Sequence, residues 1–303
     1  MRFGLVGTGP WAGMAHGPGL AAAEDVDLVG VWGRSPEKSR ILATGLGVSS
    51  FESFEALLEE VDAVAFAVPP EIQAELALVA ANAGKHLLLD KPVAMTVAGA
   101  HALRDAATSA GVASVVFFTD RFADESRAWF REVRGTNGWR GGWLRMFSSL
   151  QEPDNPFGSS PWRWAGGALW DVGPHALSQL LPALGPVSGV VGARGRGDLV
   201  HVVLTHESGV TSVMSLCMTM PTGGERVEME FYDDHGWHSR PDRERDVDEA
   251  YERALSELLA NVAAGETGHR CDVRFGRDVV AVLARCEAAL AGGGDATGGS
   301  PPA

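Results

Sequence analysis

Lys91 stands where an amine can meet a ligand in an α/β protein. It follows a short apolar run, residues 87–89, and Pro92 ends that run because proline lacks a backbone donor and fixes φ. Ligands of open α/β sheets bind at the carboxyl ends of the strands. The chain has only three lysines, and lysine can donate a proton near neutral pH whereas arginine cannot. We therefore expect Lys91 to face a ligand.

A second stretch, residues 166–175, carries an acid and a base. Asp171 and His175 are four residues apart, so the helix expected over residues 170–184 places both on one face. The ordinary pKa of histidine, about 6.5, suits proton transfer at neutral pH. On one helix such a pair is often only structural, but a strand-end lysine and a nucleotide loop in the same chain favour catalysis.

The nucleotide loop lies at the start of the chain. An apolar run at residues 2–6 precedes Gly7, Gly9 and Ala12, which match the G-x-G-x-x-G/A fingerprint between a strand and a helix. Gly7 makes the tight turn, Gly9 lets a pyrophosphate approach, and Ala12 allows close helix packing. A plain tight turn is the alternative, and the placement after the first strand favours a dinucleotide.

The end of the second apolar run, residues 26–32, favours NADP over NAD. NAD-binding proteins carry an acidic residue there to hold the ribose. This chain instead has Gly33, Arg34 and Ser35, with Lys38 nearby, and these side chains can hold a 2′-phosphate. The alternatives are that Arg34 and Lys38 are solvated residues at a helix start, or that the cofactor is NAD.

The pattern of strands and helices predicts an α/β protein with two domains. Strands alternate with helices in the first part, which indicates a Rossmann-type, doubly wound parallel sheet. From about residue 139 strands follow one another with short turns, which indicates an α+β domain with a mostly antiparallel sheet. The expected bounds are 1–119 for the Rossmann domain, 120–271 for the α+β domain, 272–290 for a last helix and 291–303 for a flexible tail rich in glycine, serine and proline.

Composition excludes several classes of protein. The net charge of −14 repels a polyphosphate backbone, so no nucleic-acid partner is expected. No apolar run reaches the roughly 18 residues that span a bilayer, and no signal peptide is visible, so a cytoplasmic protein without a membrane partner is expected. The three cysteines lack metal-ligand spacing, so we expect neither disulfides nor a metal.

Together these motifs resemble the glucose-fructose oxidoreductase / inositol dehydrogenase / MocA-like (Gfo/Idh/MocA) family of NAD(P)-dependent oxidoreductases. The resemblance rests on GLVGTGPWA at residues 4–12, AVPP at 67–70, AGKHLLLDKP at 83–92, and PWRW before GGALWDVGPHAL at 161–177. It implies that Lys91, Asp171 and His175 form a catalytic trio. It also implies that Gly7, Gly9 and Ala12 form the pyrophosphate loop and that Pro69 and Pro70 lie beside the nicotinamide. Together with the residues after the second strand, the full set expected to contact the cofactor is Gly7, Gly9, Pro10, Trp11, Ala12, Gly33, Arg34, Ser35, Lys38, Val68, Pro69, Pro70, Asp90 and Lys91.

The same resemblance implies an open-faced second sheet that forms a homodimer or homotetramer, and a last helix that packs back on the Rossmann domain. Four residues depart from the family pattern. Asp90 replaces the usual glutamate, Ala168 is the third residue of a glycine run, Gln73 stands where relatives often have histidine, and Trp170 adds bulk beside Asp171.

The expected activity is NADP-dependent hydride transfer between the nicotinamide and a secondary alcohol or ketone of a sugar, polyol or sugar derivative. Either His175 or Lys91 transfers the proton, with Asp171 orienting. Arg121 holds a ligand or pairs with a nearby aspartate. The residues expected to bind the carbohydrate-like substrate are Arg121, Trp162, Arg163 and Trp170, although tryptophans can equally be core. The alternatives are an NAD-retaining glycosidase-like enzyme and a non-catalytic nucleotide sensor.

Overall fold

The computed structural model describes residues 1–241 and 246–292, and the chain forms two compact units. Unit 1 consists of Met1–Arg127 and Glu244–Val280, and unit 2 of Ala128–Arg243 and Ala281–Ala303. This division differs from the expected bounds because the stretch after residue 244 joins the first unit rather than the second. The expected tail, apart from residues 291 and 292, lies outside the described residues.

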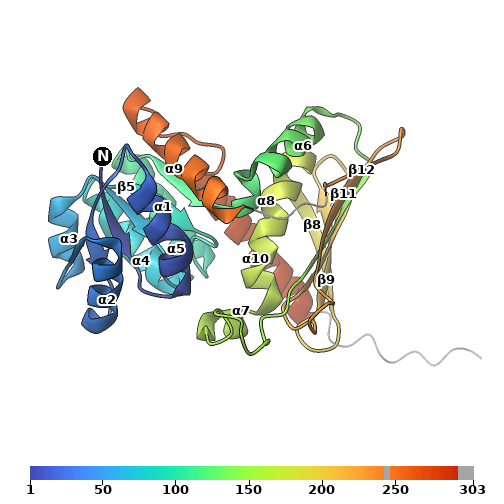
Figure 1. The fold of residues 1–303 in the computed structure, drawn as a ribbon. Helices are drawn as coiled ribbons and strands as arrows, with labels where there is room; N and C mark the ends of the chain where they lie inside the picture. Colours follow the sequence, from blue (N-terminus) through green and yellow to red (C-terminus); the bar gives the residue numbers. More distant parts are fainter. Residues whose placement is uncertain (242–245, 293–303) are drawn as a thin grey trace, which may run out of the picture. The chain divides into compact units, whose positions relative to one another are not determined.

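Unit 1 contains a six-stranded parallel sheet, sheet A, with the strand order β3-β2-β1-β4-β5-β6 (Figure 1). The order runs outward from β1 in both directions, so right-handed crossovers put the connecting helices on opposite faces. The expected doubly wound sheet is confirmed. Its strands are β1 (Arg2–Val6), β2 (Asp27–Trp32), β3 (Ser49–Ser50), β4 (Ala63–Phe66), β5 (His86–Asp90) and β6 (Ser114–Phe117).

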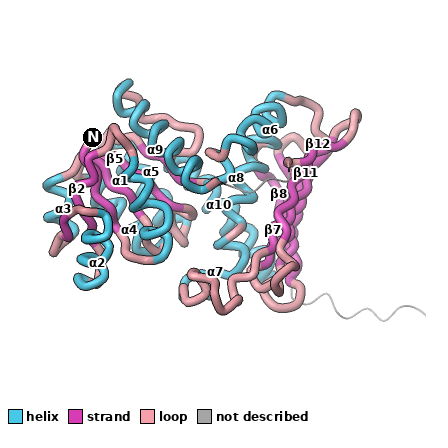
Figure 2. Tube along the Cα trace, in the orientation of Figure 1, coloured by secondary structure: helices cyan, strands magenta, loops and turns pink. Residues whose placement is uncertain are grey.

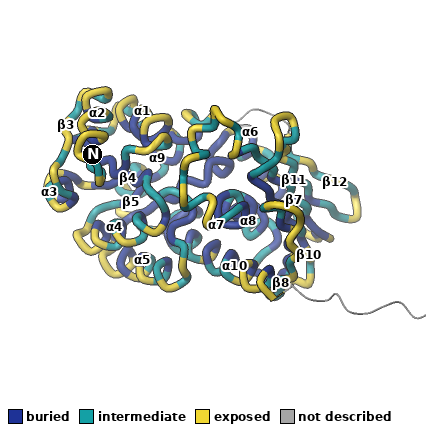
Figure 3. The backbone as a smooth tube through the Cα atoms, turned by 90° about the horizontal axis from the view of Figure 1, so that it is seen from below, coloured by how far each residue is buried: buried dark blue, intermediate teal, exposed yellow. Residues whose placement is uncertain are grey.

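Local capping fixes the helices of unit 1. Ser35, Ser53 and Thr96 each accept a backbone N–H of the first turn, which stabilises three helix starts. The outward turns of α2, α4 and α5 are exposed whereas the sheet is buried (Figure 3). The helices are η1 (Ala12–His16), α1 (Gly17–Ala22), α2 (Pro36–Leu46), α3 (Phe54–Glu60), α4 (Pro70–Asn82), α5 (Val97–Ser109), η2 (Thr119–Arg121) and α9 (Val247–Ala264).

A late stretch of the sequence completes unit 1. Helix α9 packs on β6, β5, α1, η1 and η2. The residues that follow it cover the outer edge of β6, because the N–H of Val116 donates to the carbonyl of Cys271 at 2.7 Å and the N–H of Val273 donates to Oγ of Ser114 at 3.1 Å. An edge strand that is covered in this way does not pair with other chains.

Unit 2 contains sheet B. Among its described strands only β7 and β10 pair in parallel, so the expected mostly antiparallel sheet is confirmed. Figure 2 shows α6, α8 and α10 beside this sheet. Strand β9 alternates buried and exposed residues, as a sheet with one covered face requires. The strand order is β12 (Trp237–Ser239), β11 (Arg226–Tyr232), β7 (Gly141–Phe147), β10 (Thr211–Cys217), β9 (Val200–His206) and β8 (Val187–Arg194).

The helices that carry unit 2 residues are α6 (Asp124–Gly135), α7 (Pro161–Asp171), α8 (Gly173–Leu184) and α10 (Val273–Gly292). The single helix expected over residues 170–184 is therefore wrong, since α7 and α8 meet at Val172. The first turns of α10 belong to unit 1, where Phe275 contacts the ring of Phe118. No helix within the described ranges has both the length and the apolar character to cross a bilayer.

Candidate active site

The glycine-rich turn after β1 is shaped for a dinucleotide. Gly7 has φ +128°, and a Cβ on it would lie 2.3 Å from the carbonyl oxygen of Ala67, so only glycine fits. At Gly9, by contrast, no heavy atom lies within 4 Å of the Cβ position. The turn therefore brings the chain close to β4 and leaves open space where a pyrophosphate would approach the backbone. Residues of this turn fit the cofactor that the sequence predicts.

The segment after the turn begins as a π-helix, which the sequence did not predict. Trp11 is its N-cap, and the indole of Trp11 stacks on the ring of Phe117 with 6.3 Å between centroids. Ala12 is fully buried, as its expected packing role requires, and Pro10 is exposed. Single π-turns occur often at functional sites.

The carboxyl end of β2 carries the predicted phosphate-binding residues. A Cβ on Gly33 would lie 2.8 Å from Cγ2 of Thr8, so this strand end touches the glycine-rich turn. Arg34 and Lys38 are exposed, and Ser35 caps α2. Cations beside a helix N-terminus form a site that suits a phosphate group.

The carboxyl ends of β4 and β5 supply the rim and the lysine. Val68 lies beside the turn, with Cγ1 3.2 Å from a Cβ built on Gly7. Pro69 is half-buried and Pro70 starts α4. Lys91 follows the last residue of β5, as expected, and its N–H donates to Oδ1 of Asp90 at 2.8 Å. One edge of sheet A thus presents the phosphate loop, the rim and an amine.

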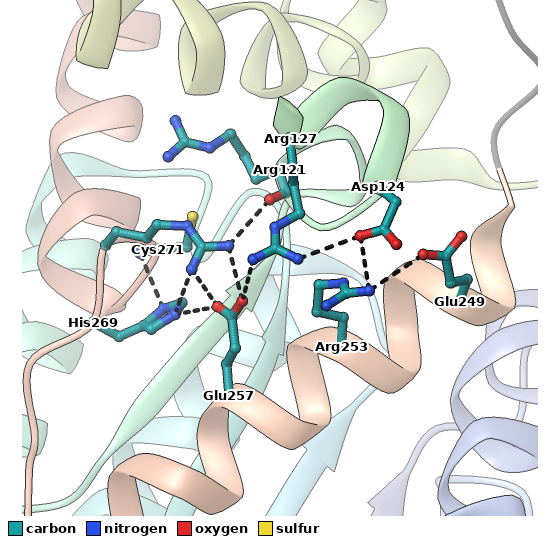
Figure 4. Close-up of polar contacts among 9 residues, drawn as sticks. Arg121, Asp124, Arg127, Glu249, Arg253, Glu257, His269 and Cys271 are labelled. Carbon is teal, nitrogen blue, oxygen red and sulfur yellow. Dashed lines mark hydrogen bonds and ion pairs between the residues drawn. The ribbon is translucent and has the colours of Figure 1, made fainter. Parts of the chain in front are cut away.

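The carboxyl end of β6 leads into a buried polar segment. Arg121 is 3% exposed, and its carbonyl accepts from Nη2 of Arg270 at 3.1 Å. Figure 4 shows the network of charged residues, from α9, α6 and the stretch after α9, that surrounds this carbonyl. Its centre is Glu257, which accepts from Nε2 of His269 at 2.7 Å and from Arg270. The substrate-binding role of Arg121 stays a prediction.

Gln73, which the sequence showed only as a departure from the family pattern, lies against the Asp90 segment. Its side chain forms hydrogen bonds to the backbone of Asp90 and Pro92. His16, at the end of η1, and Tyr251, in α9, form a second buried pair. Burial lowers the pKa of His16 to about 3 and, together with the charge of Asp90, raises the pKa of Tyr251 well above its usual value. No local pattern pointed to either contact, because the partners are far apart in sequence.

In unit 2 the acid and the base lie at the junction of two helices, and the residue that links them, Val172, has right-handed helical backbone angles. Asp171 is the last residue of α7, and His175 lies in the first turn of α8. The glycine run before them bends the chain, because Gly167 has φ +63° and ψ −170° inside α7. A backbone of this kind is nearly restricted to glycine. Ala168 does not need positive φ, so its departure from the family pattern is tolerated.

Arg163 is an ion-pair partner of Asp171. Its Nη1 donates to Oδ1 of Asp171, and both side chains are largely buried. The guanidinium also lies over the rings of Trp162 and Phe157, at 4.8 Å and 4.9 Å from their centroids. This packing fixes the arginine and holds the aspartate at the end of α7. The expected substrate-binding role of Arg163 and Trp162 stays a prediction.

Trp170 is 2% exposed, and its indole N–H donates to Oε1 of Glu287 at 3.0 Å. This burial favours the alternative that the ring belongs to the core of unit 2. The expected contact of Trp170 with substrate stays a prediction.

The expected catalytic trio is divided between the two units. Lys91 belongs to unit 1, and Asp171 and His175 belong to unit 2. Chemically, the residues comprise an amine, an imidazole and a carboxylate with its arginine, which suit general acid–base work and the stabilisation of an alkoxide. Within the described ranges no three His, Cys, Asp or Glu side chains are grouped to hold a metal ion.

Comparison with known families gives two matches. Residues 1–118 match the profile of an oxidoreductase family with an NAD-binding Rossmann fold (GFO_IDH_MocA), and residues 140–238 match the C-terminal domain of the same family. The first match contains every strand of sheet A, and the second contains sheet B except for the last residue of β12.

Individual relatives agree with these matches. A dTDP-3,4-didehydro-2,6-dideoxy-alpha-D-glucose 3-reductase of Streptomyces antibioticus is 29% identical over 228 residues, 72% of this chain and 69% of the relative. A UDP-N-acetylglucosamine 3-dehydrogenase of Acidithiobacillus ferrooxidans is 37% identical over 103 residues, 34% of this chain and 32% of the relative. The crystal structure of the WlbA dehydrogenase from Bordetella pertussis, in complex with NADH and UDP-GlcNAcA, shares the fold, with a TM-score of 0.82 at 20% identity over 96% of this chain and 97% of that one.

Proposed function

The chain belongs to the Gfo/Idh/MocA family of NAD-binding oxidoreductases, and from this premise we propose that it is an NADP-dependent enzyme acting on a sugar, polyol or sugar derivative. It is an oxidoreductase of CH–OH groups, like its named relatives. The bound nicotinamide would donate or accept the hydride, and the substrate carbon would alternate between secondary alcohol and ketone.

The observation that carries the proposal is the set of groups at one edge of sheet A. The turn at Gly7 and Gly9 leaves space for a pyrophosphate, Val68 lies beside it, and Lys91 follows β5 at the same edge. In a doubly wound sheet this edge, next to the switch between β1 and β4, is where dinucleotides bind. Asp90 and the prolines of the rim would border the nicotinamide half.

The proposed roles follow from the chemistry of each side chain. Lys91 polarises the substrate oxygen and stabilises the charge that develops on it. His175 takes the hydroxyl proton in oxidation and returns it in reduction. Asp171, held by Arg163, fixes the junction that carries His175. The alternative is that Lys91 transfers the proton and His175 orients the substrate.

For the cofactor, we favour NADP because the tip of β2 offers cations. Arg34 and Lys38 are exposed beside the start of α2, whose first turn also carries one exposed carboxylate, Glu37. A 2′-phosphate would gain charge-assisted hydrogen bonds there. NAD is the alternative, and the WlbA relative was solved with NADH.

For the substrate, we favour a hydroxyl or keto group at position 3 of a pyranose. Two of the relatives described above are named for chemistry at this position, the Streptomyces enzyme as a 3-reductase and the Acidithiobacillus enzyme as a 3-dehydrogenase. Neither name supports the glycosidase-like enzyme or the nucleotide sensor.

Assembly and location are further parts of the proposal. The side of sheet B away from its helices exposes Val191, at 70%, and Val203, at 39%. Exposed apolar residues on a sheet favour burial against a second copy, so we propose a homodimer or homotetramer through sheet B.

The cytoplasmic location stays a prediction that cell fractionation would test.

The test is an NADP⁺ reduction assay with four probes: UDP-N-acetylglucosamine, glucose 6-phosphate, methyl glucoside and myo-inositol. We expect one to be oxidised, and Lys91→Ala to lower kcat by roughly 10²- to 10⁴-fold. Lys85→Ala is the matched control, because Nζ of Lys85 donates only to the carbonyl of Val61 among the hydrogen bonds of the described residues. Turnover by Lys91→Ala at the rate of the control would refute the catalytic assignment.

A further inference from the structure

Gln73 holds the backbone on both sides of Lys91. Its Nε2 donates to the carbonyl of Asp90 at 2.8 Å and to the carbonyl of Pro92 at 3.2 Å. Its Oε1 accepts from the N–H of Asp90 at 2.8 Å. The side chain comes from the first turn of α4 and is 1% exposed. One buried amide thus forms three hydrogen bonds to a segment of three residues.

The segment needs such support because strand pairing ends there. Asp90 is the last residue of β5 that pairs with β6, opposite Phe117. Beyond it, Lys91 donates its N–H to Oδ1 of Asp90, a contact within the segment itself. The direction in which the Lys91 side chain leaves the backbone therefore depends on how residues 90 and 92 are held.

We propose that Gln73 is a positioning residue for Lys91, which it orients by clamping the backbone before and after it. The inference rests on the proposed function, in which Lys91 is catalytic. An amide suits the task because it donates two hydrogen bonds and accepts others. A neutral histidine would supply one donor and one acceptor, a leucine neither. The clamp matters to rate because small displacements of a catalytic group are costly.

The chain offers a matched control. Ser114 is also buried in unit 1, and its Oγ accepts one backbone N–H, that of Val273, at 3.1 Å. Ser114 is the first residue of β6, whereas Lys91 follows the last residue of β5. Because the two strands are parallel, Ser114 lies at the amino ends of the strands and Lys91 at their carboxyl ends. Ser114→Ala removes a buried hydrogen bond without touching the clamp.

The experiment compares Gln73→Leu, Gln73→His and Ser114→Ala by two readouts. The first, amide hydrogen exchange over residues 88–94 without cofactor, does not depend on activity. In Gln73→Leu the Asp90 N–H loses its acceptor, so we expect its exchange to be faster than in wild type by roughly tenfold or more. In Ser114→Ala we expect the exchange rate of the Asp90 N–H to be unchanged. The second is kcat with NADP⁺ and the most active of the four probes.

We expect Gln73→Leu to lower kcat by roughly 10- to 100-fold with KM and NADPH affinity within about threefold of wild type. Gln73→His should recover part of that loss. Unchanged exchange at residues 88–94, or a kcat loss no larger than that of Ser114→Ala, would overturn the inference. If Gln73→Leu does not fold, Gln73→His decides by the same two readouts. Failure of the proposed function would appear separately, as an active Lys91→Ala with the exchange result unaltered.

Discussion

The hydroxyl of Tyr251 lies 3.3 Å from Nδ1 of His16, although 235 residues separate the two in sequence. Both side chains are fully buried, and their ring centroids are 4.8 Å apart. Because the imidazole is neutral at physiological pH, with its pKa at about 3, the contact is a hydrogen bond between neutral groups. It fastens α9 to the helix that follows the phosphate loop.

Gly19→Ala should disturb this contact, because a Cβ at residue 19 would lie 2.2 Å from Cδ1 of Tyr251. The ring has no room to move in a packed core, so we expect a loss of about 1–3 kcal/mol in the free energy of unfolding, measured with urea. The control is Gly45→Ala in α2, where no atom lies within 4 Å of the new Cβ. That change should leave stability equal or raise it by up to about 1 kcal/mol. Equal stability of the two variants would contradict the packing argument.

Arg163→Met should destabilise unit 2 and lower activity. The change removes the guanidinium from Asp171, whose side chain is only 7% exposed, and breaking a buried ion pair costs about 3–5 kcal/mol. Adding Asp171→Asn should restore much of the stability, since no charge is then buried, but not the activity. Thermal unfolding and kcat of both variants test this. Arg140→Met, which breaks an exposed ion pair with Asp234, should change stability by less than about 1 kcal/mol.

Glu257 predicts a pH dependence of stability. Although burial alone would raise its pKa, hydrogen bonds and charges from His269 and Arg270 lower it to about 2, against 4.5 in the unfolded chain. A depressed carboxyl pKa stabilises the folded state above pH 4.5, and this stability is lost as the pH falls from 4.5 to 2.

At pH 7 we expect Glu257→Gln to be less stable than wild type by about 1–3 kcal/mol. The difference should shrink steadily between pH 4.5 and the lowest pH at which the protein stays folded. Urea unfolding at a series of pH values measures it. Glu252→Gln, an exposed position on the same helix, serves as the control and should follow the wild-type curve. If the difference in free energy of unfolding between Glu257→Gln and wild type stays constant with pH, the charge of the carboxylate does not contribute to stability.

Arg34→Ala should weaken the binding of NADPH far more than that of NADH. Loss of one charge-assisted hydrogen bond to a 2′-phosphate corresponds to about 1.5–3 kcal/mol, or roughly 10- to 100-fold in Kd. Fluorescence titration of both cofactors gives the ratio. Arg40→Ala, an exposed position within α2 whereas Arg34 precedes that helix, controls for the general effect of charge. Equal losses for NADPH and NADH would rule out the phosphate-binding role.

The parts of the fold that local sequence determines were predictable. Gly7 sits after an apolar strand, and its positive φ follows from the fingerprint. Lys91 follows a buried strand and precedes a proline, so its place at the strand end was visible. The alternation of strands and helices also predicted sheet A, because each βαβ unit consists of consecutive residues.

Other parts depend on contacts that no local pattern encodes. The stretch around Gly167 and Val172 looks helical throughout, but the backbone leaves the helical region at Gly167, and α7 gives way to α8 at Val172. Trp170 beside the expected acid suggested a sugar platform, whereas its partner Glu287 lies 117 residues away. The partners of Gln73 were likewise invisible, because it binds backbone groups, which are the same for every sequence.

The return of α9 has a practical consequence for anyone dissecting the protein. The nucleotide-binding unit is not encoded by one continuous stretch of the sequence. Residues after position 244 cover its edge strand, β6, and pack against η1, the helix that follows the phosphate loop. A fragment that stops at Arg127 would leave β6 uncovered and would remove Tyr251, the hydrogen-bond partner of His16. A shortened protein that contains only unit 1 therefore has to join the stretch before Arg127 to the stretch after residue 244.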